Sequence, residues 1–241
     1  MPVKTFLLII ALGLLISKAI AQNALPDSTA YSEAAKQVIV HYNLVVDDQS
    51  EFYNGVEYHL YPPAHSGSAY FQGKQVLSPS IICYNGIWYR NVPVLYERYA
   101  DVMVSGLRDS LYILRPDKTS DIYLSGHHFI YLDNLTGKNL VAGFYDQLYA
   151  GKSEVLVKRN TTVQNTITQQ TVEVNYENSE VIYIRKGGAY VQVSSKGSVL
   201  EVFKDKSKEL KQYLSGSKIS YKKDKEQSIV KLAGYYDQLT K

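Results

Sequence analysis

The feature that most constrains the fold is a series of strand-like segments joined by turn dipeptides. Between residues 44 and 195, short β-branched and aromatic runs are separated by Asn, Gly and Pro. Asn54-Gly55 and Asn85-Gly86 each follow one Tyr and lie three residues before another. Asn-Gly favours a type I′ turn, because both residues tolerate positive φ and the turn matches the twist of paired strands. The pattern predicts an antiparallel sheet with hairpins at residues 51–58 and 82–89.

Alternation along these hairpins predicts which side chains face each other. In the second hairpin, Tyr84 is expected opposite Ile87, and Cys83 opposite Trp88. In the first, the alternation predicts two opposite faces, with Val56, Tyr58 and Leu60 on one and Glu57, His59 and Tyr61 on the other.

Further strand signals continue to residue 195, with Gly187-Gly188 turning the last pair. The polar run from Asn160 to Thr171 fits either a hydrated strand or a mobile loop. The remaining candidates are Val102–Val104, Leu111–Leu114, Asp121–Leu124, Phe129–Leu132, Val155–Lys158, Val172–Tyr176, Val181–Arg185 and Tyr190–Val193.

Helical periodicity is confined to the two ends of the chain. A short helix is expected over residues 27–40, and two more at about 198–215 and 224–240. Ser198 and Glu201 form a capping-box pattern, and Gly216 can end the first C-terminal helix in the left-handed region. The apolar stripes are Val199, Val202, Phe203, Leu210, Tyr213 and Leu214, then Ile229, Leu232, Ala233, Tyr236 and Leu239. We therefore predict an α+β fold, with a predominantly antiparallel, strongly curved sheet or open barrel, a short N-terminal helix and a C-terminal helix pair.

One seven-residue segment occurs twice in the sequence in nearly identical form. Residues 142–148 (Ala-Gly-Phe-Tyr-Asp-Gln-Leu) nearly match residues 233–239 (Ala-Gly-Tyr-Tyr-Asp-Gln-Leu). Their flanks do not align, so we interpret the match as coincidence rather than duplication.

The first 21 residues are typical of an export signal. Lys4 precedes the apolar run from Phe6 to Ile16, and Ala19-Ile20-Ala21 fits a cleavage site that leaves Gln22 first. An uncleaved anchor is the alternative, but eleven helical residues span about 16 Å, roughly half a bilayer core. No later segment reaches 18 apolar residues, so no membrane span is expected after cleavage. Residues 22–241 are then predicted to form a single β-rich domain.

The cysteine count and the charge distribution indicate the cellular compartment and the class of partner. The chain has one Cys, whereas exported eukaryotic proteins usually carry disulfides, so a bacterial envelope is favoured, in the periplasm or outside the cell. Residues 196–241 carry 11 Lys, no Arg and 6 acidic residues. Because nucleic-acid sites commonly use Arg for bidentate contacts, the lysines indicate a solvated helix surface and no nucleic-acid partner, with a weak contact to an anionic surface as the alternative.

Candidate catalytic residues are few, and each has a simpler interpretation. No Gly-x-Ser-x-Gly segment is present. Cys83 lies in a predicted strand, where a thiol is usually a small buried hydrophobe. Ser215-x-x-Lys218 and Ser220-x-x-Lys223 match Ser-x-x-Lys in a Lys- and Ser-rich stretch where chance matches are expected. Local carboxylate pairs occur at Asp47-Asp48 and around Asp101 and Asp109, which sequence alone cannot bring together.

Metal binding has one candidate group. Glu57 and His59 share a predicted strand face, and His65 follows a Pro-Pro turn, so the three side chains could converge. His127 and His128 point to opposite faces of a strand, which suggests one packed and one exposed ring. No catalytic, cofactor or metal site is therefore assigned.

Several segments in order resemble a family of exported, functionally uncharacterised proteins of gram-negative bacteria. They are Tyr53-Asn-Gly-x-Glu-Tyr58, Tyr84-Asn-Gly-x-x-Tyr-x-x-Val-Pro-Val-Leu-Tyr96, Gly126-His-His-Phe129, Gly143-Phe-Tyr-Asp-Gln-Leu148 and the Lys-rich C-terminal helices. The resemblance implies export and a single domain, and it implies no catalytic residue.

Three functions from different classes follow from these observations. The first is a non-enzymatic envelope protein that binds or scaffolds another macromolecule. The second is a carrier of a lipid or other apolar ligand between sheet and helices, and the third is a hydrolase with a dispersed site. The chain contains 22 Tyr, which suit sugar stacking as well as ordinary sheets.

Overall fold

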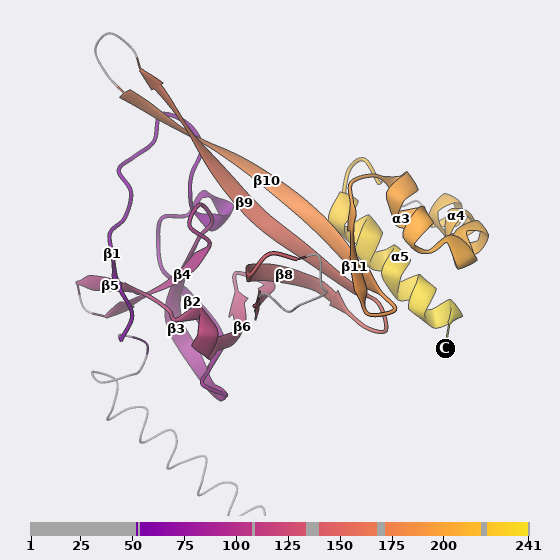
Figure 1. Cartoon of the computed structure of the whole chain (residues 1–241), viewed down its shortest axis with the longest axis horizontal. Coiled ribbons are helices and arrows are strands. Elements are labelled where there is room, and N and C mark those ends of the chain that lie inside the picture. The colour runs from indigo at the N-terminus through magenta and orange to yellow at the C-terminus, as the bar shows by residue number, and fades with distance from the viewer. Residues whose placement is uncertain are drawn as a thin grey trace, which may run out of the picture. The chain divides into compact units, whose positions relative to one another are not determined.

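The fold is one antiparallel sheet with helices at its C-terminal end. The computed structural model describes residues 52, 54–107, 109–133, 140–167, 172–217 and 221–240. These residues contain an eleven-stranded sheet that is not closed on itself, together with three α-helices (Figure 1). This arrangement confirms the predicted α+β class.

Residues 51–241 form one compact unit. The predicted signal peptide at residues 1–21 and the predicted helix at 27–40 lie outside the described residues. Both therefore stay predictions.

The sheet consists of two meanders that meet at β2 and β6. From β2 the chain winds outward through β3, β4 and β5, then returns through the 3-10 turn η4 (Pro116–Lys118) to β6 on the other side of β2. From β6 the strands follow in sequence order to β11, so the sheet order is β1-β5-β4-β3-β2-β6-β7-β8-β9-β10-β11. The strands are β1 Glu57–Tyr58, β2 Ser78–Tyr84, β3 Ile87–Glu97, β4 Val102–Leu107, β5 Ser110–Ile113, β6 Thr119–Leu124, β7 His127–Leu132, β8 Gly143–Ala150, β9 Glu154–Ile167, β10 Val172–Lys186 and β11 Ala189–Val193.

The predicted hairpin at residues 82–89 is confirmed with its register. Tyr84 pairs with Ile87, and Cys83 pairs with Trp88. Asn85 (φ 50°) and Gly86 (φ 76°) both have positive φ, as a type I′ turn requires.

Cys83 is 7% exposed on the outer side of this hairpin. We expect the native thiol to react with a thiol reagent at least tenfold more slowly than in denaturant, because reaction requires access. Replacing Cys83 by Ser should lower the free energy of unfolding by about 1–2 kcal/mol, through the buried hydroxyl. Timed thiol titration with and without guanidinium checks the first expectation. Equal rates in the two conditions would contradict the buried position.

The predicted hairpin at residues 51–58 is wrong. Gly55 lacks the positive φ of a type I′ turn, and Tyr58 pairs with Leu111 of β5 instead. Gly55 serves a close approach, because a Cβ there would lie 1.9 Å from the carbonyl oxygen of Ile113. The predicted common face fails as well: Tyr58 is buried, whereas Val56 is 73% and Leu60 43% exposed.

Each of the eight further strand candidates overlaps a strand, and two of them belong to the single long strand β10. The polar run is a strand up to Ile167, which confirms the hydrated-strand alternative there, and 168–171 lie outside the described residues. The strand β8 was not among the predicted strands. Residues 142–148 lie mostly in β8, whereas the near-identical 233–239 lie in helix α5 (Lys225–Leu239), so the match is indeed coincidental.

The first C-terminal helix is divided in two. α3 (Lys196–Val202) and α4 (Ser207–Gly216) are separated by the 3-10 turn η5 (Lys204–Lys206). The amine of Lys186 donates to the carbonyl of Val202 at 3.0 Å, an acceptor that a continuous helix would use internally. A contact from β10 thus ends α3, which the local sequence does not reveal.

Two details of helix capping also differ from the prediction. The N-cap of α3 is Ser195, which pairs with Ser198 as the N3 residue, so Ser198 is not the cap. Gly216 does not adopt a positive φ and is the last residue of α4, and Ser217 is the C-cap. Most of the predicted stripes are nevertheless confirmed, whereas Val202, Tyr213 and Leu239 are only half-buried. The buried members are Val199, Phe203, Leu210, Leu214, Ile229, Leu232, Ala233 and Tyr236.

Candidate functional site

One row of side chains crosses the sheet and connects its two main cores. Directly opposed residues share a face, and here they run through eight strands in the order Tyr89, Ile82, Ile122, Phe129, Asp146, Val157, Ile182 and Val193. Ile82, Ile122 and Phe129 belong to one hydrophobic cluster. Val157, Ile182 and Val193 belong to another, which the three helices cover. Asp146 is therefore a carboxylate placed where the two cores meet.

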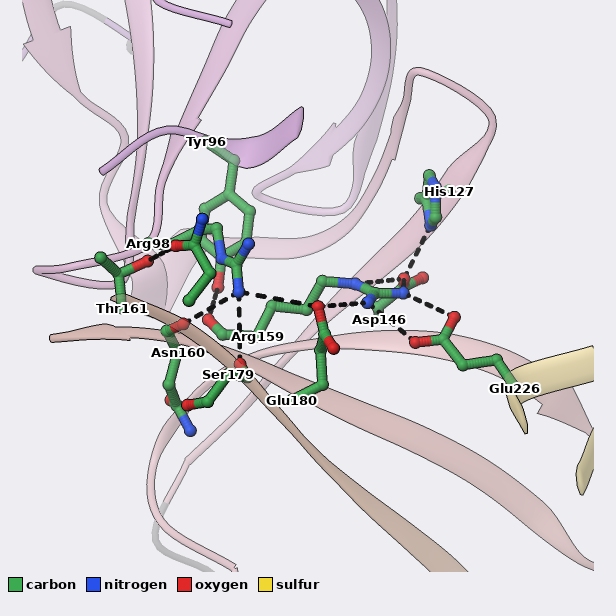
Figure 2. Close-up of polar contacts among 11 residues, drawn as sticks. Tyr96, Arg98, His127, Asp146, Arg159, Asn160, Thr161, Ser179, Glu180 and Glu226 are labelled. Atoms are coloured by element: carbon green, nitrogen blue, oxygen red, sulfur yellow. Dashed lines mark hydrogen bonds and ion pairs between the residues drawn. The ribbon is translucent and has the colours of Figure 1, made fainter. Parts of the chain in front are cut away.

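Arg159 of β9 holds this carboxylate. Its Nε and Nη2 donate to Oδ2 of Asp146 at 2.9 and 2.5 Å. Its Nη1 and Nη2 also donate to the two carboxylate oxygens of Glu226, at 2.9 and 3.0 Å (Figure 2). The fork of one guanidinium thus joins the sheet to the first turn of α5.

His127 of β7 completes the set, which we call the buried ion network (Arg159, Asp146, His127 and Glu226). Its Nδ1 lies 2.7 Å from Oδ2 of Asp146. Because an ionised carboxylate only accepts, Nδ1 carries the proton and donates. The ring also contacts Phe71 edge to face, with 4.9 Å between centroids.

A second guanidinium stands beside the network. Arg98, in the turn after β3, donates from Nη2 to the carbonyls of Asn160 at 2.9 Å and Ser179 at 3.2 Å (Figure 2). Glu180 lies 3.9 Å from Arg98 and 3.6 Å from Arg159. The turn after β3 is thereby fastened to the β9–β10 hairpin.

Burial and charge set the ionisation of the network. Desolvation acts to lower the pKa of Arg159, but the hydrogen bonds and charges of Glu226 and Asp146 outweigh it and raise the pKa. The side chain of Asp146 is fully buried, and its Oδ1 has no hydrogen-bond partner among the described residues. The network stabilises the junction of the two cores, and its His127–Asp146 pair resembles a general base with its orienting carboxylate.

The opposite face of the sheet carries a set of three rings, the outer aromatic row, in which Trp88 and Tyr123 are exposed and His128 is half-buried. The rings of Trp88 and Tyr123 lie 6.1 Å apart, and those of Tyr123 and His128 stack at 4.3 Å with a 5° interplanar angle. Nε2 of His128 lies 2.9 Å from Oδ1 of Asp121. Trp88 is 51% and Tyr123 45% exposed.

A tyrosine cluster gathers around the end of β3. Its members are Tyr58, Tyr61, Tyr70, Tyr99 and Tyr176, with Tyr61 in ring contact with the other four. Beneath them lies Glu97, fully buried, which accepts from the backbone N–H groups of Tyr99 at 2.5 Å and Ala100 at 3.0 Å. Burial raises the pKa of Glu97, although these two hydrogen bonds act to lower it.

The predicted candidates do not assemble into a site. His65 lies 3.9 Å from Glu173 rather than with Glu57 and His59, and no group of three metal-ligating side chains occurs among the described residues. The hydroxyl of Ser215 donates to the carbonyl of Lys211, and Lys218 and Ser220 lie outside the described residues. Of the carboxylates, Asp47 and Asp48 also lie outside the described residues.

Asp101 is a structural residue, because its carboxylate accepts hydrogen bonds from three different strands. It accepts from the hydroxyl of Tyr96 at 2.6 Å, from the backbone of Phe144 at 3.1 Å and from the amine of Lys158. His127 and His128 do point to opposite faces, but neither is fully exposed. Their side chains are 26% and 21% exposed, and each is paired with a carboxylate.

Sequence reasoning missed the buried ion network and the tyrosine cluster. Asp146 and Arg159 lie on the neighbouring strands β8 and β9, and the two residues are 13 positions apart in sequence. Glu226 lies on helix α5, 67 residues after Arg159. Charged residues inside strands whose other members are apolar were the available signal, because a sheet buries them only when they are paired.

Comparison of the chain with protein-family models, with curated proteins and with solved structures gave no match. The resemblance to exported gram-negative proteins therefore stays a prediction. Within the part of the chain that the structure describes, no helix has the length and apolar character needed to cross a membrane.

Proposed function

We propose that this protein is an exported, non-enzymatic binding module of the bacterial envelope, in the periplasm or outside the cell. The observation that carries the proposal is the outer aromatic row. Trp88 and Tyr123 are each about half exposed on the sheet face opposite the row of side chains that connects the two main cores. Large aromatic side chains are enriched at protein interfaces, where they bury much area at little entropic cost.

The row is held in place before any partner arrives. Tyr123 is stacked on His128, and His128 is fixed by Asp121. Cys83 lies opposite both Trp88 and Asp121 in the sheet, so these side chains stand on adjacent strands of a hydrogen-bonded framework. A rigid aromatic surface loses little conformational entropy on binding.

The alternative of an apolar-ligand carrier depends on a strongly curved sheet or open barrel. Contacts across the sheet support such curvature, because Asp101 in the β3–β4 turn bonds to β8 and β9 although β2, β6 and β7 lie between. The inner face is occupied by packed rings, with Phe71 lying 5.2 Å from Phe129 and 6.0 Å from Tyr96. This packing favours the binding module over the carrier.

The hydrolase alternative is favoured by one observation, the His127–Asp146 pair. The carboxylate would hold Nδ1 protonated and leave Nε2 able to accept a proton. We place it second, because Arg159 also binds the same carboxylate oxygen and ties the pair into the core.

The proposed binding face can be followed through the chain's single tryptophan. Trp88 is 51% exposed, so acrylamide should quench its fluorescence readily in the free protein. A purified envelope fraction that contains the partner should reduce quenching by at least about twofold, because the aromatic row is then covered. Peptidoglycan fragments, outer-membrane vesicles and soluble periplasmic protein are the three fractions to compare.

Tyr123→Ala is the test variant, with Val191→Ala, at a 45% exposed position on β11, as the matched control. Protection of Trp88 should be lost in the first variant and kept in the second. Unchanged quenching with all three fractions would contradict the proposal.

A further inference from the structure

The tyrosine cluster surrounds a carboxylate that has no cationic partner among the described residues. Glu97 is 0% exposed, and its oxygens accept from Tyr99, Ala100 and the hydroxyl of Tyr61, which lies 3.4 Å from Oε2. All of these donors are neutral. A buried charge is normally paired, so a negative charge here leaves the surface above it attractive to cations.

Three rings cover this carboxylate on the solvent side. Tyr99 is 47% exposed, and Tyr61 and Tyr176 are half-buried beside it. Burial raises the pKa of Tyr61 to about 12, so its hydroxyl stays protonated and keeps donating to Glu97. The aromatic surface is thus neutral, and the group beneath it is a carboxyl that is negative when ionised.

The three rings form a nearly equilateral triangle. Their centroids are 6.3 Å apart for Tyr61–Tyr99, 6.2 Å for Tyr61–Tyr176 and 6.4 Å for Tyr99–Tyr176. Dividing the mean side of 6.3 Å by √3 places the centre about 3.6 Å from each centroid. A cation over this centre, even about 4 Å above the ring triangle, stays within the roughly 6 Å range of cation–π attraction to all three rings.

The rings are also inclined to one another rather than stacked. Their interplanar angles are 72°, 40° and 61°, which correspond to two edge contacts and one tilted contact, so no two of the three rings are stacked face to face. Ring faces carry the negative part of the aromatic quadrupole, which is the part that attracts a cation.

The hydrogen bonds of Glu97 decide which cation fits. Its oxygens are already occupied by backbone and hydroxyl donors, so a ligand gains little from N–H groups of its own. A quaternary ammonium has no N–H group, is weakly hydrated and gains from charge and ring faces alone. Recognition of such groups is a known use of aromatic clusters.

We propose that Tyr61, Tyr99 and Tyr176, above the buried carboxylate of Glu97, form a binding site for a quaternary ammonium group of the choline type. The site lies apart from the outer aromatic row and does not depend on the function proposed for that row.

Isothermal titration of the mature chain with choline tests this proposal, with 3,3-dimethylbutan-1-ol as the neutral ligand of the same shape. Choline should bind with a millimolar dissociation constant or better, and at least about tenfold more tightly than the alcohol. Tetramethylammonium should also bind more tightly than methylammonium. Equal affinity for choline and the alcohol would overturn the proposal, as would no choline binding up to about 50 mM.

Variants assign the binding to the three rings. Tyr99→Leu should weaken choline binding at least about fivefold, whereas Tyr99→Phe, which keeps the ring, should stay within about twofold of the parent. Tyr123→Leu on the outer aromatic row is the matched control and should leave the affinity unchanged. Tyr99 is half exposed, so its variants should fold. Equal losses in the Leu and Phe variants, or tighter binding of methylammonium than of tetramethylammonium, would refute a quaternary-ammonium site.

Discussion

Replacing Arg159 by Met is expected to lower the free energy of unfolding by about 3–5 kcal/mol. Within the described ranges, Asp146 is bonded by two side chains, the guanidinium of Arg159 and the ring of His127. Met keeps the length and the apolar stem of the side chain but removes the guanidinium, including its contact 5.7 Å over the Phe71 ring, so the loss reports mainly the charged group. A buried carboxylate left with a single partner carries most of its desolvation cost.

Urea unfolding measures this loss. Arg115→Met is the matched control, because the Arg115–Asp117 pair has side chains 48% and 61% exposed. Exposed pairs contribute about 0–1 kcal/mol, so this variant should stay within about 1 kcal/mol of the parent. Similar effects of the two substitutions would show that the network at the junction of the cores is not the stabilising element described here.

Replacing Phe203 by Ala is expected to cost about 3–5 kcal/mol, through lost burial and the cavity left behind. Phe203 is fully buried between α3 and α4, and its ring stacks on Tyr236 of α5 at 4.3 Å. Its loss should weaken the attachment of all three helices to the β8–β11 end of the sheet, since short helices are marginal without packing. Lys223→Gln, at an exposed position, should change stability by less than about 0.5 kcal/mol.

Removal of residues 197–241 tests the same interface more severely. The truncated chain should be insoluble, or should lose its near-UV spectrum, because the apolar cluster of Val157, Ile182 and Val193 would be exposed. A soluble truncated protein that unfolds cooperatively with a native near-UV spectrum would instead make the helices an independent module.

Much of the fold could be predicted because its signals are local. The turn at Asn85-Gly86 specifies the register that places Cys83 opposite Trp88, and the helical stripes identified the buried side chains of α4 and α5. The hairpin at Asn54-Gly55 failed because the same dipeptide meets the backbone of Ile113, a partner about 60 residues away. A local rule holds only where no distant contact competes with it.

The candidate sites could not be predicted for the same reason. Tyr61, Tyr99 and Tyr176 come from three distant segments, and nothing in their own neighbourhoods indicates that they converge on Glu97. Likewise, Asp146 reads as an ordinary polar position in a short segment. It is a buried charge only because the sheet places it between two cores.

The difference between what local sequence determines and what tertiary contacts decide is clearest in two nearly identical segments, residues 142–148 and 233–239. The sequence by itself determined the strand and helix signals of most elements, the Asn85-Gly86 turn and the apolar stripes, because these depend on neighbours within a few residues. It could not decide that Ala-Gly-Phe-Tyr-Asp-Gln-Leu is a strand and Ala-Gly-Tyr-Tyr-Asp-Gln-Leu a helix. The tertiary structure decided this, since β8 hydrogen-bonds to β7 and β9, whereas α5 buries its stripe against the sheet and places Asp237 on Ser153 and Tyr149. The free energy of those distant contacts exceeds the small difference in local propensity between the two conformations.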